Sequence, residues 1–339
     1  MKTILLVGSG AREHAWAWKI AQSPQVKKLI LVPGNDGMFL KPGSEISARL
    51  TLERWPLGTP AQYAELAQKA QDAQVDLAVI GPDQPLAEGI VDAFLKKNIL
   101  TFGPRADAAR IESSKIFSKD VMKKAGIPTA EHFVFDSLQE AGKFLKSIPW
   151  DRGWVVKADG LALGKGVEVC QTLEQALAAC QRLLPVSGRL IVEEKLEGEE
   201  ISWMAFCDGH TCALLEPARD YKRIKDGDEG ANTGGMGSYS PVEEFLESSF
   251  FKRVREQVFE PALKEMRARC AAPGFVGVLY AGLMWDRKKD RFWVLEFNAR
   301  LGDPEAQVLL PRIEGDLLPW LEACARRRLK ESSLPERVP

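Results

Sequence analysis

Five segments of this chain of 339 residues combine glycine, charged and amide side chains at spacings that suit phosphate chemistry. The most specific is residues 157–167, which contain two lysines, Lys157 and Lys165, and three glycines. Glycine lets the backbone close over an anion, and the lysine charges neutralise it. A Walker loop runs into a helix, whereas strand-like apolar residues lie on both sides here. The segment predicts a cover over a triphosphate, with an ordinary hairpin as the alternative.

The second segment is a candidate metal site. Glu296, Asn298 and Arg300 alternate along a strand pattern, so their side chains share one face. One carboxylate and one amide oxygen suit Mg²⁺, which takes one or two protein ligands together with substrate phosphates. The neighbouring guanidinium suits an anionic group in transfer. A solvated strand edge is the alternative interpretation.

The third segment, residues 8–14, runs from a strand pattern through two glycines into a helix pattern. Backbone N–H groups at such a helix start bind anions, and the Arg12 guanidinium adds a positive charge that can form two parallel hydrogen bonds with an anion. The dinucleotide fingerprint is incomplete, because Glu13 stands where its third glycine belongs. The phosphate of a ligand smaller than NAD is therefore favoured, with NAD binding or a plain tight turn as alternatives.

Two further segments give weaker signals. Residues 193–200 place five carboxylates after an apolar strand, where one acid would accept from ribose hydroxyls and the backbone would pair with adenine; a solvated hinge is the alternative. Residues 220–241 form a long polar, glycine-rich stretch, and such loops are uncommon unless they bind a ligand. The cluster of Cys207, His210 and Cys212 favours a hairpin at Asp208 and Gly209 over a zinc site.

The elements that must position these segments follow from the apolar pattern. Continuous apolar strands alternate with helices over the first hundred residues, which predicts a parallel sheet covered on both faces. Later residues predict a β, α, β, β, α, β unit and then an antiparallel sheet. Strands are expected at 3–7, 29–32, 77–80, 99–102, 131–135, 154–158, 166–170, 190–194, 201–207, 212–216, 278–285 and 291–297. Helices are expected at 12–21, 60–73, 86–95, 105–125, 138–145, 173–184, 243–269 and 317–328.

Composition excludes several classes of protein. The length predicts two or three domains, and 45% hydrophobic with 27% charged residues is ordinary for a globular protein. A net charge of −1 gives no general reason to bind nucleic acid or an anionic membrane. No apolar run approaches the length of a membrane helix, and the first residues resemble a strand rather than a signal peptide. Scattered cysteines without a CxxC motif predict reduced thiols and a cytoplasmic location.

Taken together, these segments resemble those of the phosphoribosylamine–glycine ligases (glycinamide ribonucleotide synthetases) of the ATP-grasp superfamily, over residues 1 to about 328. The motifs occur in the family's order: GSGAREHAWAWK, PGNDG, IGPDQPLAEGIVD, ESSKIFSKD, VVKADGLALGKGV, EGEEIS, NTGGMGSYSP, YAGLM and EFNARLGDPEAQ. The resemblance implies a multidomain α/β and α+β fold, in which a parallel pre-ATP-grasp sheet precedes an ATP-grasp domain. The expected boundaries are 1–104 for the first domain, 105–126 with 193–330 for the ATP-grasp centre, 127–192 for a mobile lid and 331–339 for a polar tail.

The resemblance also implies the reaction. ATP would phosphorylate glycine, and 5-phosphoribosylamine would attack the glycyl phosphate, giving glycinamide ribonucleotide, ADP and phosphate in purine synthesis. ATP and Mg²⁺ or Mn²⁺ are the implied cofactors. Nucleotide contacts would come from Lys115, Lys157, Gly160, Gly164, Lys165, Gly166, Glu193, Glu194, Leu196 and Glu200. Substrate contacts would come from Gly10, Arg12, Glu13, Gly34, Asn35, Asp83, Asn232, Thr233, Gly234, Gly235, Met236 and Gly237. Glu296 and Asn298 would hold the metal, and the catalytic residues would be Arg300, Asp220 and Lys222.

The sequence departs from the family pattern at several places. Ala11 replaces the second of two paired glycines, Asp83 replaces glutamate, and Arg219 and Tyr221 replace glutamine and histidine. The family's C-terminal domain is absent, which would leave a surface for a partner or a second copy to cover. Neither nucleic acid nor a membrane is an expected partner. Two alternative functions remain: another ATP-grasp ligase with a different carboxylate and amine, and a non-catalytic nucleotide-binding protein.

Overall fold

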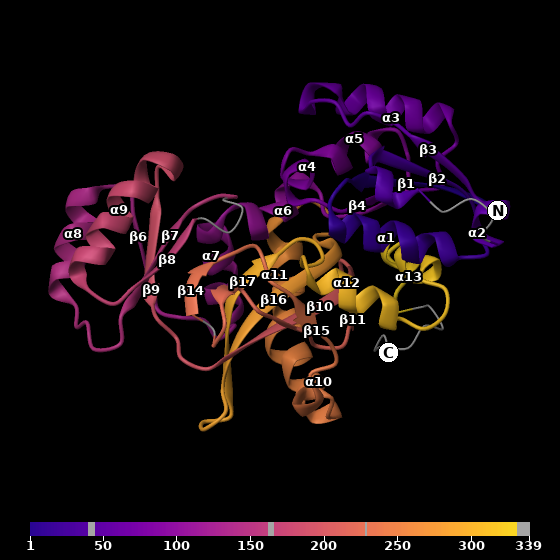
Figure 1. The fold of residues 1–339 in the computed structure, drawn as a ribbon. Coiled ribbons are helices and arrows are strands. Elements are labelled where there is room, and N and C mark those ends of the chain that lie inside the picture. The colour runs from indigo at the N-terminus through magenta and orange to yellow at the C-terminus, as the bar shows by residue number, and fades with distance from the viewer. Residues whose placement is uncertain (40–44, 162–165, 228, 331–339) are drawn as a thin grey trace.

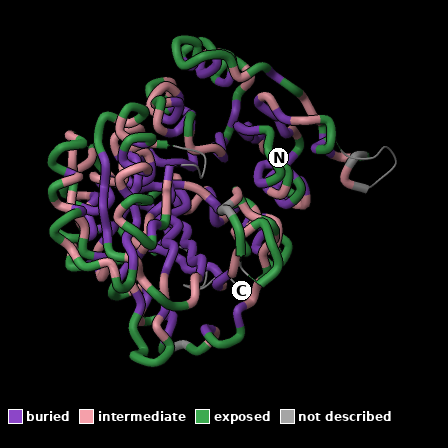
Figure 2. The backbone as a smooth tube through the Cα atoms, turned by 60° about the vertical axis from the view of Figure 1, so that its left-hand side comes forward, coloured by how far each residue is buried: buried purple, intermediate pink, exposed green. Residues whose placement is uncertain are grey.

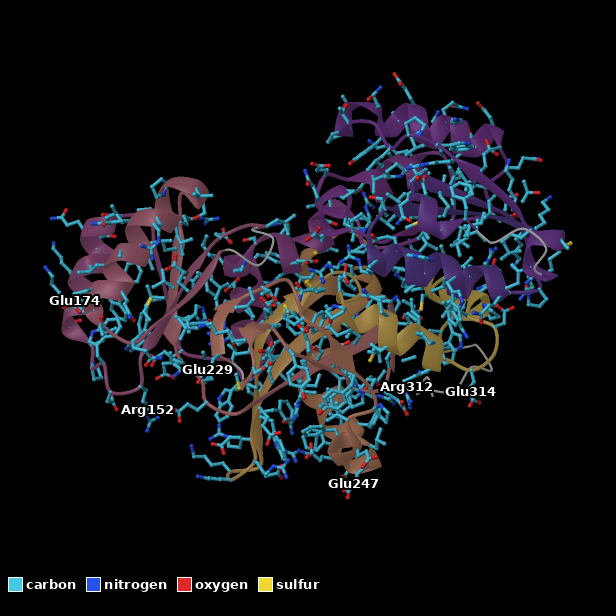
Figure 3. All side chains as sticks on the ribbon, in the orientation of Figure 1. Arg152, Glu174, Glu229, Glu247, Arg312 and Glu314 are labelled. Atoms are coloured by element: carbon cyan, nitrogen blue, oxygen red, sulfur yellow. The ribbon has the colours of Figure 1, made fainter. Side chains whose placement is uncertain are left out.

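The computed structural model of the protein describes residues 1–39, 45–161, 166–227 and 229–330. Three larger sheets organise the described chain, and Figure 1 shows them as an N-terminal body, a lid-like body at the far side and a central body between them. Buried residues concentrate along the sheets and the inner helix faces (Figure 2). Charged side chains such as Arg152, Glu174 and Glu247 project from the outside (Figure 3). No helix in the described ranges is long and apolar enough to cross a membrane.

The N-terminal sheet is parallel, with the order β3-β2-β1-β4-β5. Its described strands are β1 (Lys2–Gly8), β2 (Val26–Pro33), β3 (Thr51–Arg54), β4 (Leu77–Ile80) and β5 (Thr101–Phe102). Alternate residues of β1 enter two separate hydrophobic clusters, so both faces of the sheet are buried. The covering helices are α1 (Ala11–Gln22), α2 (Glu45–Arg49), α3 (Tyr63–Asp72), α4 (Asp83–Ala87) and α5 (Ile90–Lys96). The predicted parallel α/β sheet is confirmed.

The carboxyl ends of β1, β2 and β4 lie together, as predicted. Gly8 pairs with Pro33, and the Gly81 N–H donates to the Val7 carbonyl at 3.0 Å. The glycine-rich start of α1 therefore lies beside the turns that follow β2 and β4.

The lid-like sheet is antiparallel with the order β6-β9-β7-β8. Its described strands are β6 (His132–Phe135), β7 (Trp154–Ala158), β8 (Val167–Cys170) and β9 (Leu190–Glu194). Two helices, α8 (Leu138–Ser147) and α9 (Leu173–Ser187), pack on one face through a small apolar cluster. The predicted β, α, β, β, α, β order is confirmed.

The central sheet is antiparallel with the order β11-β10-β16-β17. Its described strands are β10 (Glu199–Asp208), β11 (Cys212–Leu214), β16 (Val276–Asp286) and β17 (Arg291–Asn298). Short ribbons pair β12 (Arg219–Asp220) with β15 (Ser238–Tyr239), and β13 (Arg223–Lys225) with β14 (Glu229–Asn232). Cys207 and Cys212 face each other across the predicted hairpin, and neither belongs to a disulfide.

The helices around the central sheet are α6 (Ala106–Ser113), α7 (Lys115–Ala125), α10 (Ser248–Val254), α11 (Glu260–Arg269), α12 (Glu305–Leu309) and α13 (Leu318–Ala325). α12 and α13 share a hydrophobic cluster with α1 and with β10, which joins the N-terminal and central bodies. The central and N-terminal bodies are therefore packed through apolar side chains as well as through the chain itself.

Three expected helices are wrong as single elements. The helix expected at 105–125 is two helices that break at Ser114, where φ is −138° and the hydroxyl accepts from the Phe117 N–H. The helix expected at 86–95 is two helices, because Gly89 lies between them at φ +89°. The helix expected at 243–269 is divided among η3 (Glu243–Phe245), α10, the π-helical segment η4 (Arg255–Phe259) and α11. The apolar period continues across each break, so periodicity alone does not reveal it.

Candidate functional site

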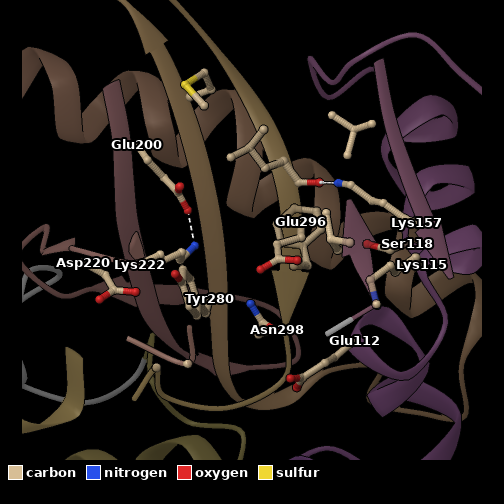
Figure 4. Close-up of a pocket in the computed structure, with 18 of the residues that line it drawn as sticks. Glu112, Lys115, Ser118, Lys157, Glu200, Asp220, Lys222, Tyr280, Glu296 and Asn298 are labelled. Carbon is tan, nitrogen blue, oxygen red and sulfur yellow. Dashed lines mark hydrogen bonds and ion pairs between the residues drawn. The ribbon is translucent and has the colours of Figure 1, made fainter. Parts of the chain in front are cut away.

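One cleft of about 860 Å³ lies where the three bodies meet, and Figure 4 shows part of its lining. Side chains from lid strands, from α6 and α7, and from β10, β16 and β17 converge on it. The cleft therefore gathers predicted residues from segments that are far apart in the sequence. These are Arg12, Asp83, Lys115, Lys157, Gly160, Gly166, Glu193, Glu194, Leu196, Glu200, Asp220, Lys222, Thr233, Gly234, Glu296, Asn298 and Arg300.

Other predicted residues lie elsewhere. Those described but outside the cleft lining are Gly10, Glu13, Gly34, Asn35, Gly235, Met236 and Gly237. Asn232 ends β14, and Gly164 and Lys165 lie outside the described residues. The described part of the cleft thus combines the expected nucleotide, metal and catalytic residues with only part of the expected substrate set.

The end of the cleft lined by β7 and β9 holds a buried cluster of three charges. Lys157 at the end of β7 pairs with one oxygen of Glu193 on β9, and Lys119 on α7 pairs with the other at 2.7 Å. Glu193 is 2% exposed and Lys119 is 3% exposed. Burial favours neutral Glu193, but the two lysine charges outweigh burial and lower its pKa. Burial also lowers the pKa of Lys119 to about 8.

Lys115 links the start of α7 to the glycine loop of the lid. Its ammonium donates to the Gly160 carbonyl at 2.8 Å, and burial lowers its pKa. The neighbouring Asp159 carboxylate accepts from the Ser114 hydroxyl at 3.0 Å and from the Ile116 N–H at 3.2 Å. The helix start is thus bound to the glycine loop through both a lysine and a carboxylate.

The two candidate metal ligands come from the same face of β17, as their spacing predicts. Burial raises the pKa of Glu296, but the charges of Lys222, Lys157 and Lys115 outweigh burial and lower it. Glu296 is therefore an ionised carboxylate beside the Asn298 amide. This donor set fits a hard cation that takes its remaining oxygen ligands from water and phosphate.

Arg300 is held at the other end of the cleft by two carboxylates. Its guanidinium pairs with Glu112 on α6 at 2.7 Å and lies 3.9 Å from Asp83. Glu112 also accepts from the Ala299 N–H at 2.7 Å. Burial raises the pKa of Glu112, and the Arg300 charge opposes that effect. Arg300 therefore lies between the end of the central sheet and the start of α4 in the N-terminal body.

A buried polar network lies next to Asp220 and Lys222 in the cleft. Glu305 accepts from Ser202 at 2.7 Å and from the Tyr280 hydroxyl at 2.9 Å, and all three residues are buried. Burial and the Glu305 charge raise the pKa of Asp220 to about 7. Lys222 pairs with Glu200, which leaves Asp220 without an ion pair among the described side chains (Figure 4).

Glu13 serves the local structure of the N-terminal loop. Its carboxylate accepts from the Gly10 N–H at 2.9 Å and from the Arg12 Nε at 2.6 Å, and it is 3% exposed. A Cβ at Gly8 would lie 2.1 Å from Glu13 Cγ, and one at Gly81 would lie 2.5 Å from it. The glycines make room for a carboxylate that orients Arg12, which does line the cleft.

The segment around residue 233 packs against the same region. The Thr233 hydroxyl donates to the Lys222 carbonyl at 2.9 Å, and the Met236 N–H donates to the Tyr221 carbonyl at 2.7 Å. Gly235 has φ +128°, and a Cβ there would meet Pro304 Cδ at 2.4 Å. Glycine is needed at this position because the backbone passes close to the turn that precedes α12.

Sequence reasoning missed four residues at this site: Glu112, Lys119, Tyr280 and Glu305. Each lies inside an otherwise apolar helix or strand pattern, or next to a stronger motif. A charged residue on the buried face of a predicted helix was the available signal for Glu112 and Lys119, because such residues are seldom buried without a partner. Tyr280 gave no such signal, since a tyrosine in an apolar strand is ordinary.

Comparison with protein families and relatives agrees with this geometry. The family model "Phosphoribosylglycinamide synthetase, N domain" matches residues 2–112, and the model for its ATP-grasp (A) domain matches residues 113–306. A phosphoribosylamine–glycine ligase of Halalkalibacterium halodurans is 42% identical over 328 residues, which covers 94% of this chain and 72% of that relative. The trifunctional purine biosynthetic protein adenosine-3 of Gallus gallus is 44% identical over 338 residues. That match covers 98% of this chain and 32% of the relative, so the chain spans about a third of the trifunctional protein.

Solved structures show the same fold. A phosphoribosylamine–glycine ligase of Thermotoga maritima superposes with a TM-score of 0.77 at 30% identity, covering 99% of this chain and 77% of that one. The biotin carboxylase domain of 2-oxoglutarate carboxylase from Hydrogenobacter thermophilus, solved with MgADP, has a TM-score of 0.68 at 18% identity. It covers 96% of this chain and 70% of that chain. At this identity the second likeness concerns the fold alone.

Proposed function

Because the chain belongs to the phosphoribosylglycinamide synthetase family, we propose that it joins glycine to 5-phosphoribosylamine with the hydrolysis of ATP. The products are glycinamide ribonucleotide, ADP and phosphate. The observation that carries the proposal is that lysines, the Glu296–Asn298 pair and Arg300 line the same cleft. A nucleotide, a divalent cation and an anionic intermediate each find matching charges there.

In the proposed reaction, a glycine carboxylate oxygen attacks the γ-phosphorus of ATP and ADP leaves. The amine of phosphoribosylamine then attacks the carbonyl carbon of glycyl phosphate, phosphate leaves, and the amine gives up a proton. Positioning and charge neutralisation dominate phosphoryl transfer, so the roles of the side chains are mainly electrostatic. A bound Mg²⁺ or Mn²⁺, held by Glu296 and Asn298, would supply further neutralisation of phosphate charge.

We assign the cleft residues to three tasks. Lys115, Lys157 and the glycine loop bind the ATP phosphates, while the backbone near Glu194–Leu196 and the Glu200 side chain bind the adenosine part. Arg300 and Lys222 stabilise the charge of the acyl phosphate, and Asp220 faces the glycine. Arg12 and Asp83, at the carboxyl ends of the N-terminal strands, bind phosphoribosylamine together with Gly10, Gly34 and Asn35.

The domain boundaries belong to the same proposal. Residues 127–192 act as a lid that closes over the nucleotide, because Lys157 of β7 and Gly160 of the loop after it line the cleft. Closure would exclude water from the acyl phosphate, which water otherwise destroys. We also propose that the enzyme acts in the cytoplasm, and that a partner or second copy covers part of the N-terminal body.

The proposal is tested by measuring ADP release with glycine and phosphoribosylamine present together or singly. Product identification by mass spectrometry should detect glycinamide ribonucleotide only when both substrates and Mg-ATP are present. Arg300→Met should remove this activity, whereas Arg152→Met on the outer surface should retain it. ADP release with a different carboxylate and amine would favour another ATP-grasp ligase, and the absence of ADP release with bound Mg-ATP would favour a binding protein.

A further inference from the structure

Lys119 is a buried lysine whose task the proposed reaction leaves open. It lies in the middle of α7, shortly before the proposed lid begins at residue 127, and its side chain lines the nucleotide end of the cleft. Its ammonium contacts the Glu193 carboxylate at 2.7 Å and the Thr129 hydroxyl at 2.7 Å. Thr129 in turn donates to the Val294 carbonyl at 2.6 Å, so the ammonium has a fixed position. Among the described residues, Glu193 is the one carboxylate within ion-pair distance of Lys119.

The same carboxylate binds Lys157, which we have proposed to contact the ATP phosphates. Glu193 has two oxygens, and each carries one lysine (Figure 4 shows the bond from Lys157). A single lysine on this carboxylate would form a neutral buried pair, with no net charge to attract a phosphate. Two lysines leave the cluster with one net positive charge at the edge of the cleft.

Lys157 would also interact with two anions, the Glu193 carboxylate and the bound triphosphate. When a triphosphate enters, the ammonium of Lys157 is shared with it, and the interaction with Glu193 weakens. Glu193 is only 2% exposed, so water cannot replace the lost interaction with Lys157. Leaving such a charge unpaired is costly, because desolvation is not repaid. The second lysine removes that cost, since it stays on the other oxygen.

We propose that Lys119 is a positioning residue for nucleotide binding, which neutralises Glu193 so that Lys157 is released to the phosphates. The inference rests on the proposed function only through its nucleotide site. It makes ATP affinity depend on the net charge of the three-residue cluster, provided that Lys157 is present to contact the phosphates.

The test is a set of four proteins measured for Mg-ATP binding by calorimetry: wild type, Lys119→Met, Glu193→Gln and the double variant. Lys119→Met leaves a neutral cluster, and we expect ATP to bind roughly 10- to 100-fold more weakly. The double variant again carries one net positive charge, on Lys157. Its ATP affinity should therefore recover to within about fivefold of the wild-type affinity. The KM for glycine should stay within about twofold, because the cluster lies at the nucleotide end.

A purely structural role for Lys119 predicts the opposite pattern. The double variant would then bind ATP no better than Lys119→Met, and both would lose thermal stability in parallel. Lys124→Met, which removes an exposed lysine from the same helix, is the matched control and should bind ATP like wild type. Melting temperatures of all variants establish that each is folded before binding is compared.

The outcomes separate this inference from the proposed function. If wild type itself does not bind Mg-ATP at millimolar concentration, the nucleotide site is wrong. If wild type binds and Lys119→Met binds equally well, the positioning role of Lys119 is overturned while the nucleotide site stands.

Discussion

Glu112 and Arg300 form a buried ion pair of 2.7 Å, and the second oxygen of Glu112 accepts from the Ala299 N–H at 2.7 Å. One carboxylate therefore fixes both the side chain and the backbone at the end of β17. Asn298, the candidate metal ligand, immediately precedes the bonded peptide. The direction in which Asn298 and Arg300 point into the cleft depends on this contact from α6.

We predict that Glu112→Gln lowers turnover more than it lowers ATP affinity. The amide keeps an acceptor for the Ala299 N–H but loses the charge that orients Arg300. We expect kcat to fall by about ten- to a hundredfold, since one misplaced charged group typically costs that much. Steady-state kinetics with varied ATP and calorimetry with Mg-ATP provide the measurement. A rise in the ATP Kd that equals the fall in kcat would contradict the role assigned to Glu112.

Replacing the candidate metal carboxylate should abolish turnover and leave the fold intact. Glu296→Gln removes a negative charge that lies near three lysines. Because glutamine has nearly the same shape as glutamate, the change opens no cavity. Lost neutralisation of phosphate charge should cost about 4 kcal/mol in the transition state, or roughly a thousandfold in rate. Turnover at increasing Mg²⁺, with the melting temperature as a control for folding, checks this prediction. Wild-type turnover would refute the metal assignment.

The raised pKa of Asp220 predicts a pH-dependent stability. Its pKa is about 7 in the folded protein, owing to burial and the Glu305 charge, against 3.8 for the ordinary carboxyl. Between these values the folded state holds a proton that the unfolded state has released, so stability falls as pH rises from about 4 to 7. Asp220→Asn removes this loss and should stabilise the protein by about 1–2 kcal/mol at pH 8, after discounting for partial exposure.

Urea unfolding of wild type and Asp220→Asn at pH 5 and at pH 8 provides the comparison. The stability difference should be larger at pH 8 than at pH 5. An equal difference at both pH values would show that Asp220 titrates normally. Since Asp220 is also a proposed catalytic residue, the variant should lose ligase activity although it is more stable.

Nucleotide binding should protect the loop between β7 and β8 from hydrogen exchange. Lys115 already contacts Gly160, so the described ends of the loop are near the phosphate site before ATP arrives. Saturating Mg-ATP should slow exchange at the amides of Gly160, Leu161, Gly166 and Val167, because closure reduces local opening. Helix α13, on the far side of the central body, is the internal control. Unchanged protection at these amides would count against the phosphate-loop assignment.

Gly81→Ala should destabilise the protein through Glu13. The added Cβ would lie 2.5 Å from Glu13 Cγ, and the carboxylate is fixed by Gly10 and Arg12. Overpacking of this kind costs about 1–3 kcal/mol. Urea unfolding of Gly81→Ala and of the double variant with Glu13→Ala separates the causes. The double variant should be less destabilised than the sum of the two single changes, and simple additivity would exclude the clash.

The sequence predicted strands well where burial alone determines them. Strands β4, β7 and β9 match the expected ranges residue for residue, because continuous apolar runs end there at glycine or at charged residues. β3 was missed because Thr51–Arg54 lies at a sheet edge and has no alternating pattern of apolar and polar residues. The ribbons β12–β15 and β13–β14 were missed because pairing with another segment, rather than periodicity, defines them.

The candidate site was predicted in the same uneven way. The period of two along β17 correctly placed Glu296 and Asn298 together in the cleft. The contacts of Glu193 with Lys119, and of Glu112 with Arg300, depend on how α7 and α6 approach strands that come much later in the chain. No local pattern encodes such an approach, so those partners required the three-dimensional structure. The hydrogen bonds of the Glu13 carboxylate with Gly10 and Arg12 could not be read from the sequence either, and the predicted contact of Glu13 with substrate stays a prediction.

The break at Ser114 has a consequence for how this protein tolerates insertions and deletions. Glu112 lies in the last turn of α6 and pairs with Arg300, while Lys115 begins α7 and contacts the glycine loop. The two helices that carry these contacts are therefore joined by a single residue, Ser114, which also caps α7. A single residue gained or lost there would change the orientation of α7 relative to α6, and with it the position of Lys115 relative to Glu112. Length at this joint should be under stricter selection than the identity of most residues around it.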